Sequence, residues 1–274
     1  MDMRITLSHF LVENDRLLST LRRIPGFRFC AKKFGARMLP ADHREWFQVQ
    51  DGMGKDIWLK LNPRSGGHYY RGQADAELQG VLRDYLKPGM VFYDLGSNNG
   101  FFSLLGSRSV GPTGRVIAFE AEPSLGADIV ENIERNKAQN VQLVRCAVWS
   151  SSGFVDFSSA DRFSSPDAGL GKVVSRSTAG TIPVPSVCLD DYVQTERPPD
   201  FIKCDVEGAE LEVFRGAAKL LAGHRPYVEC EVHSDENGKH LNAKFEEMNY
   251  DVKWYSTNHF LAVPRNRTFH TVIE

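Results

Sequence analysis

Short apolar runs alternate with amphipathic stretches through the middle of the chain. The apolar runs are typical of buried strands, and the stretches between them repeat hydrophobic residues at helical spacing. The pattern predicts strands at residues 91–95, 115–119, 141–148, 201–205 and 226–232, and helices at 74–86, from 101 onward, at 125–137 and at 207–221. Because strands separated by helices favour parallel crossovers, we expect an α/β domain with one principal core.

The residues before this alternation form a smaller pattern. Residues 1–23 place apolar side chains at roughly helical spacing, interrupted by charged ones, which predicts an amphipathic helix. Residues 45–61 predict two short strands around a turn at Asp51-Gly52. We therefore expect an N-terminal extension over residues 1–73, made of a helix and a β-hairpin, and a main domain over residues 74–274.

Two further segments complete the main domain. Residues 158–181 are rich in Ser, Gly and Asp with little periodicity, which predicts a long loop. Loops of this length are often lids or substrate-contacting segments, and a surface insertion without a role is an equally good interpretation. Strand-like runs at 250–255 and 260–263 lie so close in the chain that they predict an antiparallel hairpin.

Charge and hydropathy narrow the class of partner. The 33 basic and 35 acidic residues nearly balance, whereas nucleic-acid binding normally needs a basic excess or stripe. We therefore expect a small-molecule partner and no nucleic acid. No apolar run approaches the ~20 residues that cross a bilayer, and the N-terminal helix does not resemble a signal peptide. The expectation is a soluble, cytoplasmic protein without a membrane span, and self-association into a homo-oligomer is left open.

The cysteines predict neither a disulfide framework nor a zinc site. They are scattered without paired spacings, their number is odd, and three of them lie in apolar strand-like runs. We expect reduced core residues at Cys30, Cys146, Cys188, Cys204 and Cys230.

The strongest chemical signal joins a predicted strand to a predicted helix and has the sequence YDLGSNNG at residues 93–100. Gly96 and Gly100 allow a sharp turn and let a ligand approach the backbone closely. The dinucleotide-binding pattern would need glycine at position 98, where this chain has Asn98, so the segment argues against NAD.

Asp94 narrows the ligand further. Its carboxylate lies where a pyrophosphate would otherwise rest on the following helix N-terminus, and it would repel phosphate. S-adenosylmethionine has no phosphate, and its amino group and sulfonium are positive, so an acidic residue suits it. A simpler interpretation is that Asp94 only caps the next helix.

A second signal follows the next predicted strand. A carboxylate at Glu120 can accept both ribose hydroxyls of a nucleoside. Glu122 competes for this role, and spacing alone does not decide between them. We favour Glu120 because it lies nearer the end of the strand.

A third signal again joins a strand to a helix, at residues 200–210. Ligands of open parallel sheets bind beyond the carboxyl ends of the strands, which places Asp205 near the cofactor. Asp205 and Glu207 are candidates for cofactor binding, substrate orientation or base catalysis. The alternative is that Asp205, Glu207 and Glu210 simply complement the positive end of the helix dipole.

Alternation along the strands predicts a buried ion pair. Lys203 lies in a central strand, where an unpaired ammonium would cost several kcal/mol. We expect a carboxylate near it, from the set Glu229, Glu231 or Glu210. His233 lies at the carboxyl end of the next strand and is a candidate base, although a lone histidine is more often structural.

These motifs resemble the FkbM-type methyltransferases, through DLGSNNG at 94–100, AFE at 118–120 and above all DFIKCDVEGAE at 200–210. The resemblance covers roughly residues 74–235. It implies a Rossmann-like, seven-stranded methyltransferase sheet, mostly parallel, with the C-terminal hairpin supplying an antiparallel last strand. It also implies S-adenosylmethionine as methyl donor and an oxygen of a secondary metabolite or glycan as acceptor. The residues expected to bind the cofactor are Asp94, Gly96, Ser97, Asn98, Gly100, Glu120, Ala147 and Asp205.

Methyl transfer to an aliphatic hydroxyl needs an aligned acceptor and a base. We assign the base to Asp205, with Glu207, Glu231 and His233 as reserves. No resident metal is assigned, but a divalent cation held by acids around Asp205 is a variant that spacing leaves open. The rivals are a non-catalytic cofactor-binding sensor or scaffold of the same fold and, less favoured, an NAD-dependent oxidoreductase.

Overall fold

The computed structural model describes residues 3–14, 20, 43–63, 66–159, 171–174 and 180–267, and all structural statements below refer to these residues. The chain divides into two compact units, and the division falls between Ala76 and Glu77. Each unit is described by itself.

The first unit holds α1 (Met3–Glu13), β1 (Glu45–Gln48), β2 (Trp58–Leu61) and the single turn α4 (Gly67–Tyr70). β1 and β2 pair antiparallel, with Phe47 opposite Leu59, and both side chains are buried. The part of the expected N-terminal helix beyond α1 lies largely outside the described residues.

The second unit is built on a seven-stranded sheet. In sheet order the strands are β12 (Tyr250–Trp254), β13 (His259–Pro264), β11 (Tyr227–Glu231), β10 (Phe201–Cys204), β3 (Val91–Leu95), β4 (Arg115–Phe119) and β5 (Val141–Val144). β13 runs antiparallel to both of its neighbours, and the pairs from β11 to β5 are parallel. The expected mostly parallel sheet with an antiparallel C-terminal strand is confirmed.

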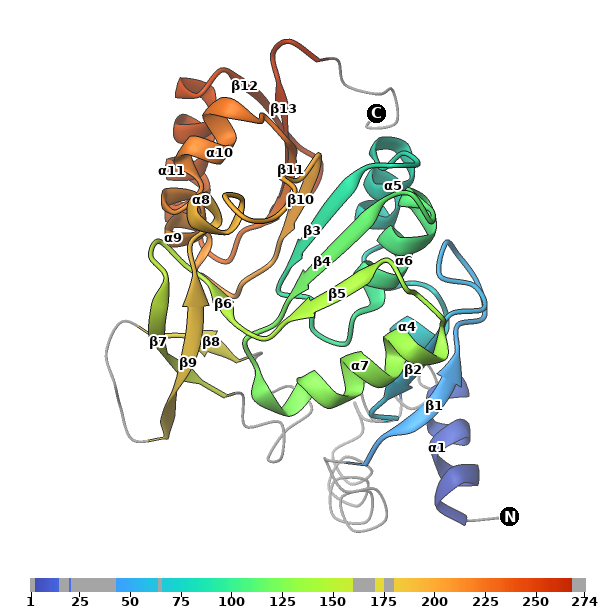
Figure 1. Cartoon of the computed structure of the whole chain (residues 1–274). Helices are drawn as coiled ribbons and strands as arrows, with labels where there is room; N and C mark the ends of the chain where they lie inside the picture. The colour runs from blue at the N-terminus through green and yellow to red at the C-terminus, as the bar shows by residue number, and fades with distance from the viewer. Residues whose placement is uncertain are drawn as a thin grey trace. The chain divides into compact units, whose positions relative to one another are not determined.

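Helices cover both faces of this sheet (Figure 1). α5 (Ala76–Tyr85) and α6 (Phe101–Val110) lie on one side, and α7 (Gly126–Arg135) follows the short turn η1 (Pro123–Leu125). On the other side lie α8 (Leu189–Tyr192), α9 (Glu210–Arg215), α10 (Ala218–Gly223) and α11 (Asp235–Glu247). Burial on both faces explains why the central strands are continuous apolar runs rather than alternating ones.

A small second sheet was not expected from the sequence. Its order is β6 (Ala147–Val148), β9 (Thr181–Val187), β7 (Gly153–Ser158) and β8 (Lys172–Val173). The single strand predicted at 141–148 is two strands, β5 and β6, because the Cys146 N–H donates to the Val144 carbonyl (3.0 Å) where β5 ends. β9 escaped the pattern because Pro183 and Pro185 argue against a paired strand.

The segment predicted as a loop at 158–181 contains β8, so the prediction is incomplete there. The remainder of that segment lies mostly outside the described residues.

The helix predicted at 207–221 is two helices, α9 and α10, and begins later than expected. The interruption falls at Gly216, where a Cβ would lie 2.3 Å from the Trp149 carbonyl oxygen. α11 was missed altogether, although Ser234 accepts a hydrogen bond from the Asn237 N–H as a helix N-cap does. A polar, capped helix of this kind carries a weak apolar pattern.

The predictions for the cysteines and for membrane-spanning helices can be compared with the structure. Cys146, Cys188, Cys204 and Cys230 are buried free thiols, as expected, and Cys30 lies outside the described residues. Among the helices of the described residues, none has the length and apolar character needed to cross a membrane.

Candidate active site

The carboxyl ends of four parallel strands carry the predicted site residues. β3 and β10 are neighbours in the sheet although they are far apart in the chain, and the strand order reverses between them. Such a reversal is where open α/β sheets bind ligands. Gly96 follows β3, Glu120 follows β4, Asp205 follows β10 and His233 follows β11 closely.

The turn after β3, residues 96–100, is called the glycine turn below, and it requires glycine for two reasons. Gly96 has a φ of 76°, and a Cβ there would lie 1.8 Å from the Asp205 carbonyl oxygen. The turn therefore packs directly on the end of β10. Gly100 (φ 81°) begins α6 in the left-handed region, and Asn98 shares that conformation (φ 51°). The hydroxyl oxygen of Ser97 is buried and makes no hydrogen bond within the described part of the chain.

Glu120 and Glu122 have different surroundings. The Glu120 carboxylate accepts hydrogen bonds from the Asn98 N–H (2.7 Å) and the Glu122 N–H (2.8 Å), so it links the ends of β3 and β4. Glu122 is almost fully buried and accepts from the backbone and hydroxyl of Ser124. Glu122 therefore caps η1, whereas Glu120 lies against the glycine turn.

Lys203 is buried beneath this turn. Its ammonium lies 3.3 Å from Asp94 Oδ1 and 3.5 Å from Asp205 Oδ2, and it donates to the Gly96 carbonyl at 3.0 Å. The expected ion pair is present. Its direct carboxylates are Asp94 and Asp205, which were not in the expected set, whereas Glu229 of that set attracts Lys203 from the neighbouring strand. The cross-strand register explains this, since Lys203 stands opposite Asp94 on β3.

Glu229 lies on the other side of Lys203, opposite it on β11. Burial disfavours the charge of Lys203, but attraction to Asp94, Asp205 and Glu229 outweighs burial and raises its pKa. Glu229 itself accepts from the Tyr255 hydroxyl (2.6 Å) and lies 2.8 Å from His259 Nδ1. A row of alternating charges thus crosses the sheet beneath the glycine turn.

Asp94 is part of this row. Its carboxylate is fully buried and also accepts from the Ser103 hydroxyl of α6 at 2.5 Å. In this structure Asp94 acts on the glycine turn through Lys203, which bonds the Gly96 carbonyl. Asp94 therefore orders the turn from below, and direct contact with a cofactor stays a prediction.

Four carboxylates surround His233 and are called the carboxylate cluster below: Asp205, Glu207, Glu210 and Glu231. Its Nδ1 lies 2.7 Å from Glu210 Oε1, and its Nε2 lies 3.4 Å from Glu207, 3.7 Å from Asp205 and 3.9 Å from Glu231. Burial lowers the pKa of His233. The hydrogen bond to Glu210 and the attraction of Glu207 outweigh burial and raise the pKa to about 9. The imidazole is therefore cationic at neutral pH.

The carboxylates of this cluster differ. Glu210 is fully buried, and burial raises its pKa, but hydrogen bonds from His233, the Gly208 N–H and Asn237 lower it below its usual value. Glu207 has a left-handed backbone (φ 54°), and burial raises its pKa against the opposing effect of His233. Such strain in a non-glycine residue is concentrated at functional sites. Asp205 Oδ1 is buried and accepts no hydrogen bond among the described residues.

Part of the same cluster has the geometry to hold a cation. Asp205, Glu231 and His233 each offer one ligand atom, and these atoms lie within 4.8 Å of one another. A divalent cation would have to displace the proton of His233, because imidazole binds metals in its neutral form. The arrangement is compatible with the metal variant and does not require it.

A family model described as a methyltransferase FkbM domain matches residues 94–252, which is more than half of the chain. The match begins at the glycine turn and includes the whole carboxylate cluster. The chain belongs to the FkbM methyltransferase family.

Relatives of this FkbM chain share parts of it. Hexuronic acid methyltransferase AglP of Haloferax volcanii is 32% identical over 161 residues, which cover 57% of this chain and 62% of that protein. A protein-L-isoaspartate O-methyltransferase of Triticum aestivum is 41% identical over 58 residues, which cover 21% of this chain and 25% of that protein. A solved methyltransferase FkbM from Methylobacillus flagellatus KT is 19% identical, with a TM-score of 0.46 over 64% of this chain and 43% of that chain. The match thus spans about three fifths of the AglP protein.

Within the FkbM domain, Ala147 belongs to the second sheet, in an apolar group that also contacts Ala121. It is buried in β6 and packs in a small apolar group with Phe157 and Val184. The structure thus brings Gly96, Glu120 and Asp205 to one edge of the main sheet, while Ala147 belongs to the second sheet. Its contact with the cofactor stays a prediction.

Sequence reasoning missed three residues of the charge network. Glu210 was considered only for the helix dipole or for Lys203, but it holds His233. Tyr255 and His259, which hold Glu229, were not considered. Their signal was weak, since both belong to the turn or start of an apolar hairpin strand.

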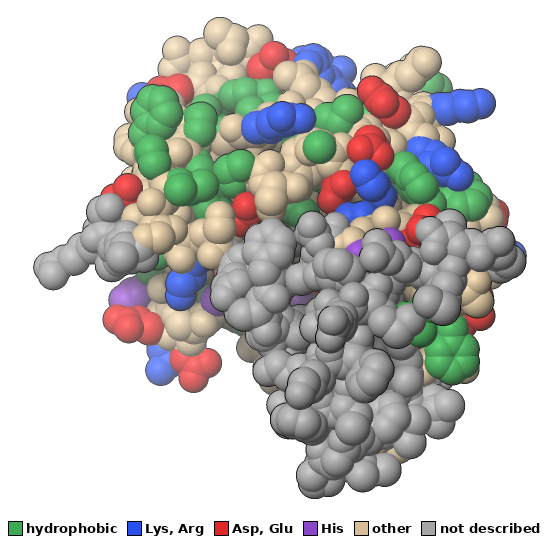
Figure 2. Space-filling view, turned by 90° about the horizontal axis from the view of Figure 1, so that it is seen from below, with side chains coloured by type: hydrophobic (Ala, Val, Ile, Leu, Met, Phe, Trp, Pro, Cys, Tyr) green, Lys and Arg blue, Asp and Glu red, His purple; other side chains and the backbone are tan. Residues whose placement is uncertain are grey.

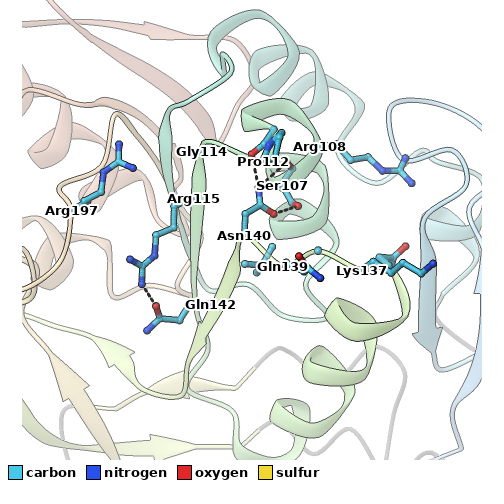
Figure 3. A pocket seen from close by; sticks show the side chains of 14 residues that line it. Ser107, Arg108, Pro112, Gly114, Arg115, Lys137, Gln139, Asn140, Gln142 and Arg197 are labelled. Atoms are coloured by element: carbon cyan, nitrogen blue, oxygen red, sulfur yellow. Dashed lines mark hydrogen bonds between the residues drawn. The ribbon is translucent and has the colours of Figure 1, made fainter.

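A pocket of about 850 Å³ lies at the opposite end of the strands from the carboxylate cluster (Figure 3). It is lined at the amino ends of β4 and β5 by cationic side chains that include Arg108, Arg115 and Arg197. Arg115 is already paired with Glu196 at 3.2 Å. Because this pocket is at the amino ends of the strands, we do not place methyl transfer there.

Proposed function

We propose that this FkbM chain is an S-adenosylmethionine-dependent O-methyltransferase whose acceptor is a hydroxyl of a small molecule or sugar. The observation that carries the proposal is the meeting of the glycine turn with Asp205, whose carboxylate is the base. The similarity to a hexuronic acid methyltransferase supports a sugar acceptor. On the face seen in Figure 2, acidic and basic side chains of the described residues are interspersed, which suits a small acceptor better than a polyanion.

The residues of the turn fit the cofactor. The buried Ser97 hydroxyl, which makes no hydrogen bond among the described residues, is available to a ligand, and the glycine at 96 lets the turn pack against the end of β10. The Glu120 carboxylate is held against the turn by hydrogen bonds from the Asn98 and Glu122 N–H groups, and we assign the ribose hydroxyls to it. The acids around His233 suit a ligand with positive charge. When bound, the cofactor would supply an electrophilic methyl group on a sulfonium.

The chain's own part is to orient the acceptor and remove its proton. Asp205 accepts the hydroxyl proton on Oδ1, the oxygen that has no hydrogen bond among the described residues. Lys203 holds the other oxygen at 3.5 Å and so fixes the carboxylate plane. His233 stays protonated at neutral pH and balances the negative charge of Glu207 and Glu231. A positioned base of this kind contributes about 10²–10⁴-fold to rate.

The test is the variant Asp205→Asn, assayed for methyl transfer to hydroxyl acceptors and for S-adenosylmethionine binding by calorimetry. We expect turnover to fall about 10²-fold or more while cofactor binding is retained. Asp251→Asn is the control, because Asp251 is an exposed carboxylate of β12. Full turnover by Asp205→Asn with normal cofactor binding would remove Asp205 from the role of base.

A further inference from the structure

A groove of about 740 Å³ lies beside the carboxylate cluster. One wall is the face of α11 that carries Asp235, Lys239 and Asn242, and the other is the end of β12 with the turn before β13. His233 lines the groove and also lies 3.7 Å from Asp205. The groove therefore ends one side chain away from the proposed base.

Trp254 forms an aromatic surface in this groove. The residue is 37% exposed, whereas most large apolar residues in the described part of the chain are buried. Its indole N–H donates to Asn242 Oδ1 at 3.2 Å, and its ring packs on Phe260 with centroids 5.2 Å apart. A Cβ on Gly238 would lie 3.1 Å from the ring. The indole is thus fixed from three sides and its remaining surface is open, so the ring is preorganised for a ligand.

The turn between β12 and β13 is tied to the same cluster. Asn258 donates to Glu231 at 2.8 Å, and its carbonyl accepts from the Val232 N–H at 2.7 Å. Both residues that the turn holds lie next to His233 in the fold. The position of the turn relative to the proposed base is therefore set by hydrogen bonds and not by loose packing.

The mixture of groups in the groove indicates its ligand. An aromatic face accepts the apolar C–H face of a saturated ring, while the carboxylate of Asp235, the ammonium of Lys239 and the hydroxyl of Thr257 can bond groups at the rim. A pyranose has this pattern, with an apolar face and hydroxyls around its edge. A flat, purely apolar acceptor would make no use of the polar groups at the rim.

From these features we propose that the groove between α11 and the β12–β13 turn is the acceptor subsite, and that it binds a pyranose ring stacked on Trp254. This deepens the proposed function and rests on it for the chemistry, but not for the binding. The subsite holds the sugar so that a hydroxyl at the edge of its ring reaches the carboxylates around His233.

Binding is tested first, without turnover. The indole N–H signal of Trp254 is assigned in the full-length protein by its loss in Trp254→Phe, and methyl β-D-glucopyranoside, methyl β-D-glucuronide and catechol are titrated separately. We expect the glycosides to shift the Trp254 signal and to leave that of Trp149 in place. If no glycoside shifts it, or if only catechol does, the groove is not a pyranose subsite.

Kinetics test the same subsite in a second way. With a sugar acceptor, Trp254→Ala should raise the acceptor KM about tenfold, equivalent to about 1.4 kcal/mol, and leave the KM for S-adenosylmethionine unchanged. Lys239→Ala, at an exposed helix position that tolerates alanine, should raise the acceptor KM severalfold without a risk to folding. Phe154→Ala is the matched control, because Phe154 is an exposed aromatic residue of β7.

The two proposals fail differently. If methyl transfer to sugars occurs and neither groove variant changes the acceptor KM, the subsite is elsewhere and the proposed function stands. If glycosides bind at Trp254 but no hydroxyl is methylated, the subsite stands and the proposed function falls.

Discussion

At the scale of single residues, Lys203 is the centre of the charge network. Its ammonium is shared by Asp94, Asp205 and the Gly96 carbonyl, and it is almost fully buried. It therefore links the glycine turn to the proposed base. The sequence showed that a buried lysine needs a partner and offered Glu229, Glu231 and Glu210. Only the register between strands placed Asp94 opposite Lys203.

We expect Lys203→Met to destabilise the protein by about 3–5 kcal/mol, because it leaves the buried Asp94 carboxylate unpaired. The measurement is urea unfolding of the wild type and the variant. The double variant Asp94→Leu, Lys203→Met removes both charges and should recover much of the loss. Equal losses in the single and double variants would show that packing, and not the unpaired charge, is responsible.

His233 predicts a pH dependence of stability. Its folded-state pKa of about 9 lies above the ordinary value of 6.5, so the folded protein holds this proton more tightly than the unfolded chain does. The resulting stabilisation is fully present below about pH 6.5 and is lost as pH rises through about 9. Urea midpoints near pH 6.5 and above pH 9 should therefore differ more for the wild type than for His233→Gln.

The control for this comparison is His240→Gln, at an exposed histidine of α11. It should keep the wild-type pH dependence. A direct check is the titration of the His233 ring by NMR, and a midpoint near the ordinary histidine value would refute the proposed charge of the cluster.

At the scale of elements, the close contact between the turn after β3 and the end of β10 sets the site. We expect Gly96→Ala to abolish S-adenosylmethionine binding, because its Cβ would meet the Asp205 carbonyl oxygen at 1.8 Å and push the turn away from β10. Calorimetry measures the binding, and urea unfolding measures the accompanying loss of stability.

Gly111→Ala is the matched control for this substitution. Gly111 has a similar φ of 66°, but a Cβ there would meet nothing within 4 Å. It should cost only the penalty of its positive-φ backbone (ψ −174°), about 1–3 kcal/mol, and leave cofactor binding intact. Retention of cofactor binding in Gly96→Ala would mean that the turn can move without loss of the site.

The elements themselves were predicted unequally well. The strands expected at 91–95 and 115–119 coincide with β3 and β4, because both are buried on two faces and read as continuous apolar runs. β9 was hidden by Pro183 and Pro185. The division between α9 and α10 depends on the contact of Gly216 with Trp149, which is 67 positions earlier in the chain and leaves no local trace.

At the scale of the whole molecule, the described cysteines report on the core. Cys146, Cys188, Cys204 and Cys230 are buried, and burial raises the pKa of Cys146 to about 12 and also raises those of Cys204 and Cys230. Buried thiols react through rare openings, since the thiolate is the reactive form.

We therefore expect thiol reagents to modify these four cysteines in the native protein only at the rate of unfolding, and rapidly in urea. Peptide mass spectrometry after a labelling pulse distinguishes the sites. Fast native labelling of Cys204 or Cys230 would contradict the sheet assignment, because both lie in its central strands.

The sequence by itself determined where the principal strands lie along the chain, the glycine turn after β3 and the acids at the strand ends. These follow from local rules, namely hydrophobic period, the backbone freedom of glycine and the alternation of side chains along a strand. Only the tertiary structure decided that Lys203 pairs with Asp94 and Asp205, and that Glu210 holds His233. It also placed Trp254 beside that cluster. These contacts depend on the register between strands and on where helices pack, and so on residues far apart in the chain.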